Sequence, residues 1–278
     1  MTWRALGLLS LLTLSLLLAS CGELQRHVAG LDLLYADSGA APPVASYAFD
    51  GSLVDAAGNT SLTRLDDSAS PLIDDLVFVE DRDGNPGSAV VVRTRFAVLL
   101  PDEVLPRSVV FWARSPSIEE AAGSADSPAV DTTVQVALTA DVNGLVDPQR
   151  SPDRLLFEIR NNYEFNDLSR RISLQLGDRN WSESKSREVN DGELWTVGEW
   201  QLFTLIWDRA GYLNMFIDGR ALVGIPAAFS EEDLSFMSGL VVNDWEGVVA
   251  IDDLQVYDTV LSRRDMDAIY AGTFTPGE

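Results

Sequence analysis

Residues that carry thiol and imidazole chemistry are almost absent from this sequence. Its 278 residues include one cysteine, Cys21, and one histidine, His27. A reactive thiol needs a base to form its thiolate, and a zinc site needs several sulfur or imidazole ligands. The sequence therefore disfavours a cysteine nucleophile and a zinc centre. A single cysteine forms no internal disulfide, so the fold has to be stabilised by packing.

Positive charge is also scarce. Lys and Arg number 20 against 43 Asp and Glu, which gives a formal net charge of −23. Such a field repels phosphate backbones and anionic membrane surfaces, so nucleic acid is disfavoured as a partner. Calcium and neutral or cationic partners stay open. Solubility of an exported protein is the simpler reason for the acidity.

The apolar run near the start is too short for a stable membrane span. It follows Arg4 and extends without a charge from Ala5 to Ser20, whereas a spanning helix needs ~20 apolar residues. One early charge, a short apolar region and small residues at its end are typical of a signal peptide. We therefore predict a signal peptide over residues 1–20.

The lone cysteine lies directly after this run. Leu18-Ala19-Ser20-Cys21 resembles the bacterial lipobox, in which cleavage falls before the cysteine and its sulfur carries a diacylglycerol. Acyl chains contribute ~0.8 kcal/mol per buried methylene, so two or three chains anchor a protein without a spanning helix. The resemblance implies lipidation at Cys21, a bacterial cell-envelope location and a membrane anchor. Residues 21–44 contain small residues and a Pro-Pro pair, which predicts a tether.

The remaining residues, 45–278, predict one all-β domain. Short segments with period-two alternation or β-branched and aromatic content are separated by Gly, Asp, Asn and Pro clusters. These segments are VASYAF, SAVVVRTRFAVL, SVVFWARS, TTVQVALTA, RLLFEIRN, RISLQLG, WQLFTLIW, YLNMFIDG and VAIDDLQVYD. In WQLFTLIW both faces are apolar, which indicates a strand inside a packed sandwich. The polar stretches 113–131 and 177–198 predict long loops, whether functional or disordered.

Local signals at the end of the chain predict one turn and one helix. In FIDGR, Asp218 and Gly219 predict a tight turn with side-chain capping and positive φ. In SRRDMDAIYAG, Ser262 is the expected N-cap, Asp265 occupies the third helical position and Gly272 stops the helix.

Five stretches in order resemble the laminin-G-like branch of the concanavalin A-like lectin/glucanase superfamily. They are YAFDGSLVDAAGN, DRDGNPGSAVVV, SVVFWARS, GEWQLFTLIWDRAGYLNMFIDGRAL and IDDLQVYDTVLSRRDMDAIY, which together extend from Tyr47 to Tyr270. The resemblance implies an antiparallel two-sheet jelly-roll sandwich with one short C-terminal helix. The same architecture serves lectins, glycosidases and adhesion modules, so the site has to decide the function.

The sequence does not show the carboxylate pattern of the enzymes in that superfamily. Those enzymes place acids on one strand face through a Glu-x-Asp-x-Glu alternation, and retaining glycosidases need two carboxylates ~5 Å apart. The nearest runs, VEDRD and IDDLQVYD, do not match it. Nor does any histidine follow His27 to act as base for a serine nucleophile. We therefore expect no catalysis.

Four acids are candidates for calcium. Asp81 and Asp83 begin a DRDGN stretch, but the glycine spacing and the final glutamate of an EF-hand loop are missing. Asp252 and Asp253 are adjacent in a strand, and strict alternation would turn one of them inward. A turn with capped backbone amides at the first pair and hydrogen bonding at the second are the simpler interpretations. No other cofactor is expected.

Aromatic residues in polar surroundings are the candidates for sugar binding, because a flat ring can pack on a pyranose face. They are Trp181, Trp245 and Tyr163, whereas Trp112, Trp200 and Trp207 lie in apolar strands and are expected in the core. A loop aromatic that packs back on the sheet is the alternative. The sequence as a whole favours a non-catalytic surface binding or adhesion lipoprotein for carbohydrate or a surface protein. A structural envelope scaffold is the alternative.

Overall fold

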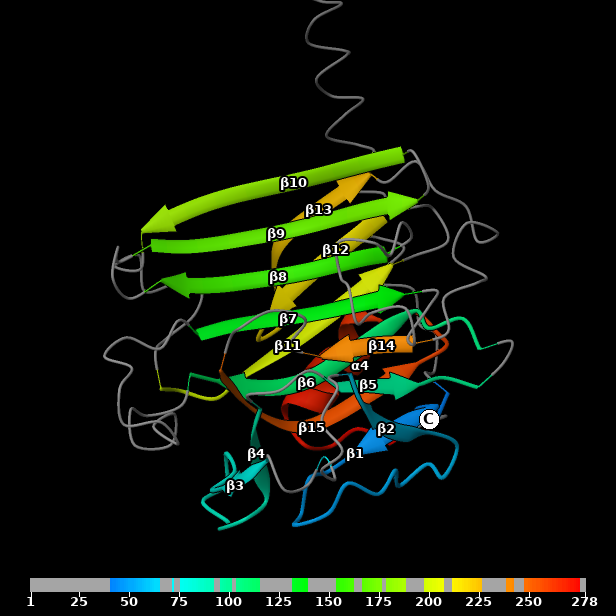
Figure 1. Ribbon diagram of the computed structural model, residues 1–278, viewed down its shortest axis with the longest axis vertical. Coiled ribbons are helices and arrows are strands. Elements are labelled where there is room, and N and C mark those ends of the chain that lie inside the picture. The colour runs from blue at the N-terminus through cyan, green and yellow to red at the C-terminus, as the bar shows by residue number, and fades with distance from the viewer. Residues whose placement is uncertain are drawn as a thin grey trace, which may run out of the picture.

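A computed structural model gives the arrangement of the domain (Figure 1). The structure describes residues 41–65, 72, 76–92, 96–101, 104–115, 132–139, 154–162, 167–176, 179–188, 198–207, 212–226, 239–242 and 248–275. The predicted signal peptide, the lipidation site and nearly all of the predicted tether lie outside these ranges. Within them, no helix is long and apolar enough to cross a membrane.

Antiparallel strands form two sheets that pack face to face (Figure 1). The eight-stranded sheet has the order β13 (Arg220–Pro226), β12 (Tyr212–Ile217), β11 (Gln201–Trp207), β6 (Ser108–Arg114), β15 (Val249–Tyr257), β4 (Ala89–Val92) and β3 (Val77–Val79), and β1 (Ala45–Tyr47) also pairs with β15. The seven-stranded sheet has the order β10 (Arg179–Glu188), β9 (Asp167–Leu176), β8 (Arg154–Asn162), β7 (Thr132–Thr139), β14 (Gly239–Val242), β5 (Phe96–Leu99) and β2 (Ser61–Arg64). The predicted fold class, an all-β two-sheet sandwich with one short C-terminal helix, is confirmed.

The prediction of a long loop over 177–198 is wrong. Residues Arg179–Glu188 form β10, which pairs with β9 along its whole length. The segment RNWSESKSRE has no apolar alternation, and alternation is the signal by which a strand is recognised in sequence. The adjacent strand supplies the backbone partners instead. The first two residues of the loop predicted over 113–131 belong to a strand instead, because β6 extends to Arg114; residues 116–131 lie outside the described ranges.

The main core lies between the two sheets. Phe111 of β6 and Phe203 of β11 stack with ring centroids 5.5 Å apart, and Trp207 is fully buried beside them. Phe96 and Leu240 of the seven-stranded sheet belong to the same cluster. Burial of large side chains stabilises by about 1.5–3 kcal/mol each, which is how a fold without a disulfide is held together.

A second core covers the other face of the eight-stranded sheet. Val110, Trp112, Leu202 and Ile206 point away from the main core and are all at least nine-tenths buried. Their cover is the C-terminal helix α4 (Arg263–Tyr270), whose Met266 joins the same cluster. The prediction that the strand at 201–207 is apolar on both faces is thus confirmed, and a helix covers its second face.

Helix α4 begins and ends as its sequence predicts. The Ser262 hydroxyl accepts from the backbone N–H of Asp265, and the Asp265 carboxylate accepts from the backbone N–H of Ser262, which is a capping box. Ala271 is the C-cap, and Gly272 follows with φ of +67°, a conformation that glycine adopts without strain. These caps fix the helix against the sheet.

Asp55 organises the loop between β1 and β2. Its carboxylate accepts hydrogen bonds from the backbone N–H groups of Ser46, Ala57, Asn59 and Thr60, and from the Thr60 hydroxyl. Burial opposes ionisation, but these hydrogen bonds outweigh it and lower the pKa of Asp55. Asp55, the second of the two acids in YAFDGSLVDAAGN, therefore has a structural role.

The turn between β12 and β13 has the predicted conformation. Asp218 and Gly219 have φ of +49° and +70°, as a type I′ turn requires. The Asp218 carboxylate accepts from the backbone N–H of Leu202 at 2.8 Å and from the Gln201 amide at 3.0 Å. Arg263 of α4 donates to the Gly219 carbonyl oxygen. One turn therefore connects β11, β12 and the helix.

We expect Asp218→Ala and Gly219→Val each to lower the free energy of unfolding by about 1–3 kcal/mol. The first removes the acceptor for two donors, and the second forces a β-branched residue into positive φ with its Cβ 3.0 Å from the Arg263 guanidinium. Chemical denaturation of each variant measures the effect. Asp258→Ala, at an exposed position on the described surface, is the control, and unchanged unfolding in both turn variants would disprove the assigned role.

Candidate functional site

A partly buried ion cluster lies on the outer face of the eight-stranded sheet. The Arg82 Nη1 atom contacts the Asp252 Oδ2 atom at 3.1 Å and the Asp253 Oδ2 atom at 2.6 Å. The Asp252 side chain is only 5% exposed, whereas that of Asp253 is 33% exposed. A single guanidinium therefore holds two adjacent carboxylates, one buried and one open to solvent.

A β-bulge in β15 brings the two carboxylates to the same side. The register between β15 and β6 shifts between Asp252 and Gln255, and Asp253 has φ of +49°. A bulge adds a residue to one strand and breaks the alternation of side chains. Strict alternation therefore does not hold through the pair, but one acid, Asp252, is buried as expected and is held by Arg82. Positive φ in a residue other than glycine is uncommon, and Asp tolerates it better than most residues.

The turn between β3 and β4 presents Arg82 to this cluster. The Asp81 carboxylate accepts from the backbone N–H groups of Asp83 and Asn85 and from the Asn85 side-chain amide, each at 2.8 Å. Burial opposes ionisation of Asp81, but these hydrogen bonds, together with Arg82, lower its pKa. Asp83 is exposed and lies 4.0 Å from Arg82. Asp81 thus shapes the turn that carries the arginine.

The two carboxylates of the cluster differ in electrostatic setting. Burial, followed by repulsion from Asp253, raises the pKa of Asp252 to about 7, although Arg82 partly offsets both effects. Burial alone would lower the pKa of Arg82, but its hydrogen bond and ion pair with Asp253 raise it. Arg82 therefore stays charged while Asp252 titrates near neutral pH.

Aromatic rings surround the cluster. The Arg82 guanidinium lies over the Trp112 ring, 4.7 Å from its centroid, which is cation–π geometry. Tyr270, the last residue of α4 and 52% exposed, contacts Trp112 with centroids 5.5 Å apart. The Phe274 ring packs edge to face on the Tyr257 ring, with ring centroids 6.1 Å apart. These two ring pairs hold the helix and the following segment to the sheet.

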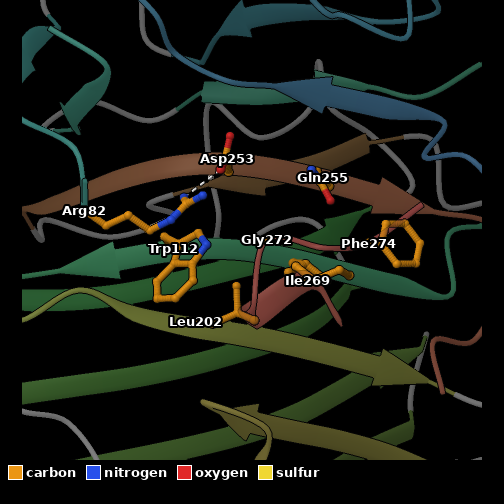
Figure 2. A pocket seen from close by; sticks show the side chains of 9 residues that line it. Arg82, Trp112, Leu202, Asp253, Gln255, Ile269, Gly272 and Phe274 are labelled. Atoms are coloured by element: carbon orange, nitrogen blue, oxygen red, sulfur yellow. Dashed lines mark hydrogen bonds and ion pairs between the residues drawn. The ribbon is translucent and has the colours of Figure 1, made fainter. Parts of the chain in front are cut away.

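A cavity of about 170 Å³ opens between the sheet and the C-terminal segment (Figure 2). Its polar wall consists of Arg82, Asp253 and Gln255. Its floor consists of Val110, Trp112 and Leu202, and the facing wall of Ile269, Gly272 and Phe274. The cavity thus combines hydrogen-bonding groups with apolar side chains, a combination that is common in small-molecule sites.

Gln255 is oriented by a neighbouring phenol. The Tyr257 hydroxyl donates to the Gln255 side-chain oxygen at 2.6 Å. Burial, together with the charges of Asp265 and Asp253, raises the pKa of Tyr257, so the phenol keeps its proton and remains a donor. The Gln255 side-chain carbonyl is therefore occupied by the phenol, and Gln255 is one of the residues that line the cavity.

Only some of the candidate residues predicted from the sequence lie at this site. Arg82 joins Asp252 and Asp253, which are brought together, while Asp81 and Asp83 flank the arginine in its turn. Among the described residues, no group of three or more His, Cys, Asp or Glu side chains is arranged to hold a metal ion. Trp181 lies on β10 in the other sheet, and Cys21, Tyr163 and Trp245 lie outside the described ranges.

The cavity residues Arg82, Gln255 and Phe274 were not foreseen from the sequence, and Trp112 was expected only in the core. Trp112 is 7% exposed, so that expectation is correct for its burial but omits its contact with the cavity. A signal did exist for Arg82, because it is the one basic residue between the candidate acids Asp81 and Asp83. Its partners are 170 and 171 residues away, which no local pattern reveals.

The raised pKa of Asp252 predicts a pH dependence of stability. An unfolded Asp has a pKa of ~3.9, so between that value and about 7 the folded chain binds a proton that the unfolded chain releases. The free energy of unfolding therefore falls as pH rises through this window, and the loss is complete above the folded pKa.

In Asp252→Asn this pH-dependent contribution to the free energy of unfolding should vanish, because asparagine has no carboxyl group to titrate. We compare the free energies of unfolding of the variant and the original protein. The difference, variant minus original, should be about 1–3 kcal/mol larger at pH 8 than at about pH 4. Denaturant unfolding at both pH values measures the difference. Asp83→Asn, whose carboxylate is 69% exposed, is the matched control. Parallel pH profiles for Asp252→Asn and the original protein would contradict the assignment.

No family model matches the sequence, and no curated protein matches it either. Among solved structures, it is similar to the botulinum neurotoxin serotype D binding domain, with a TM-score of 0.52 at 15% identity over 83% of this chain and 50% of that one. It is also similar to the serotype D ligand-binding domain in complex with N-acetylneuraminic acid (TM-score 0.51, 16% identity, 83% and 50% coverage). A third is the HCR/D F1240A mutant (TM-score 0.55, 14% identity, 83% and 51% coverage). The chain spans about half the length of these structures, and the likeness shows a shared β-sandwich fold.

Proposed function

We propose that this protein is a non-catalytic binding or adhesion module that recognises carbohydrate. The observation that carries the proposal is the cavity beside the Arg82 cluster, where a polar wall of Arg82, Asp253 and Gln255 faces the apolar side chains of Ile269 and Phe274. Sugars combine hydroxyl groups with an apolar ring face, so this pairing of surfaces suits them.

The similarity to solved structures also supports a binding function. Two of the similar solved structures are described as binding domains, one of them in complex with N-acetylneuraminic acid. We further propose that the sandwich belongs to the laminin-G-like branch that its sequence resembles. A surface protein is the other kind of ligand for such a module, and a structural envelope scaffold is the alternative function.

A glycan array with the purified protein tests this proposal. We expect selective binding to a subset of glycans, and a blank array would favour the scaffold instead. Trp181→Ala and Trp245→Ala test the two tryptophans that the sequence alone suggests: neither is among the described residues that line the cavity, so binding at the cavity should be unchanged in both variants, and a loss of about tenfold would place the sugar at these aromatics instead. Trp181→Phe, which keeps a ring, is the control for lost packing.

We also propose that the domain is exported and anchored through lipid on Cys21. The support is sequence alone: the uncharged run that ends in Leu18-Ala19-Ser20-Cys21. A tether over 21–44 would then separate the sandwich from the membrane, and the cavity would be displayed on the cell envelope.

Cys21→Ser tests the anchor, because serine cannot form the thioether. We expect the variant to remain uncleaved or to be released from membranes, measured by fractionation and intact mass. Ser20→Ala, which keeps a small residue before the cysteine, should behave like the original protein. Recovery of Cys21→Ser in membranes at the mature mass would disprove lipidation.

A further inference from the structure

We propose that the cavity beside Arg82 binds a single neutral sugar ring and discriminates against anionic sugars. This inference rests on the proposed carbohydrate-binding function and names its site and ligand class. It follows from the cavity's size, from the hydrogen-bonding groups that remain available and from the charges already present.

The size of the cavity admits one ring. Its volume is about 170 Å³, close to the ~150 Å³ of an engineered protein cavity that takes one benzene molecule. A chain of several sugar units does not fit in that space. The cavity therefore suits the terminal residue of a glycan, with further units outside.

Two side chains offer the hydrogen bonds that hydroxyl groups need. The Gln255 carbonyl accepts from Tyr257, and its amide nitrogen donates to no other described residue, so two N–H donors remain. The Asp253 Oδ2 atom is held by Arg82, while no described residue donates to its Oδ1 atom. A sugar hydroxyl can accept a hydrogen bond from the Gln255 amide and donate one to the Asp253 Oδ1 atom. An ammonium ligand would meet the Gln255 donors unfavourably.

The opposite wall suits the carbon-bound face of the ring. Ile269 and Phe274 line it and are partly buried against the second core. Phe274 is fixed edge to face on Tyr257, so the wall is already formed without a ligand. In Figure 2 these side chains lie across the opening from Asp253 and Gln255. A ring with polar edges and an apolar face fits between them.

The charge of the cluster disfavours an anion. Arg82 is a cation that lines the cavity, and both Asp252 and Asp253 already contact it, so its charge is balanced within the cluster. The guanidinium also lies over Trp112. The whole chain adds a net charge of −23. A carboxylate-bearing sugar would enter against this field and find no unpaired cation there among the described residues.

Titration calorimetry and saturation-transfer NMR on the purified full chain test the inference. The probes are methyl glycosides of glucose, galactose, mannose and N-acetylglucosamine, free N-acetylneuraminic acid, and oligosaccharides that end in the best neutral ring. We expect at least one neutral glycoside to bind, its oligosaccharide to bind equally or better, and N-acetylneuraminic acid to bind at least about tenfold more weakly.

Three variants locate the site. Gln255→Leu removes the amide donors and Ile269→Phe fills the cavity, and each should weaken the neutral glycoside at least about tenfold. Asn214→Leu is the matched control, because Asn214 is on β12 of the same sheet but does not line the cavity. Its binding should be unchanged, and thermal melts verify that all three variants fold.

The outcomes separate this inference from the proposed function. Sugar binding that survives both Gln255→Leu and Ile269→Phe would move the site elsewhere and overturn the inference, while the carbohydrate-binding function would stand. Preference for N-acetylneuraminic acid over every neutral glycoside would also overturn the inference and leave the carbohydrate-binding function standing. Failure to bind any sugar, in solution or on the array, would overturn both.

Discussion

The ion pairs of Arg82 with Asp252 and Asp253 are the interaction on which the candidate site depends. Two adjacent carboxylates, one of them 4% exposed, would repel each other strongly in a poorly hydrated setting if no cation lay between them. Arg82 offsets that repulsion at 3.1 and 2.6 Å and at the same time covers Trp112. One side chain therefore ties the β3–β4 turn to β15 and β6, and the bulge at Asp253 persists because both carboxylates are held. Loss of Arg82 would remove the cation that offsets burial and the repulsion from Asp253, and so would raise the pKa of Asp252 further.

The cavity itself results from burying one sheet on both faces. Val110, Trp112, Leu202 and Ile206 make the outer face of β6 and β11 apolar, so that face needs a cover. The cover is α4, which has 8 residues and is therefore about 12 Å long. Strands lie about 4.8 Å apart, so such a helix covers only two or three of them. Beyond its end, the segment through Phe274 completes the cover along one side, and the space left against Asp253 and Gln255 is the cavity.

What the sequence predicts here is local, and what it misses is long-range. Asp218-Gly219 and the Ser262–Asp265 capping box combine residues a few positions apart, so their patterns are visible in the sequence and the structure has both. The strand β10 was missed because RNWSESKSRE has no apolar periodicity. The bulge is not predicted, because no local pattern in IDDLQVYD marks an unpaired residue. The bulge becomes visible only when β15 is paired with β6. The site needed both the bulge and a contact between residues 171 positions apart, so no reading of the sequence could assemble it.

A site of this size has a physical consequence for how it could act. Free energy of binding grows with the atoms that make contact, and a single sugar ring offers few of them, so each cavity can hold its ligand only weakly even though Tyr257 and Arg82 preorganise the polar wall. Strong attachment to a glycan-bearing surface would then require many copies acting together, because linked binding events gain from effective concentration without any new contact. The proposed anchor at Cys21 would supply such an array, since proteins fixed in one membrane would face the same surface at high local density. The proposed lipid anchor and the proposed neutral-sugar cavity are therefore compatible, because the anchor would make a weak site sufficient for adhesion.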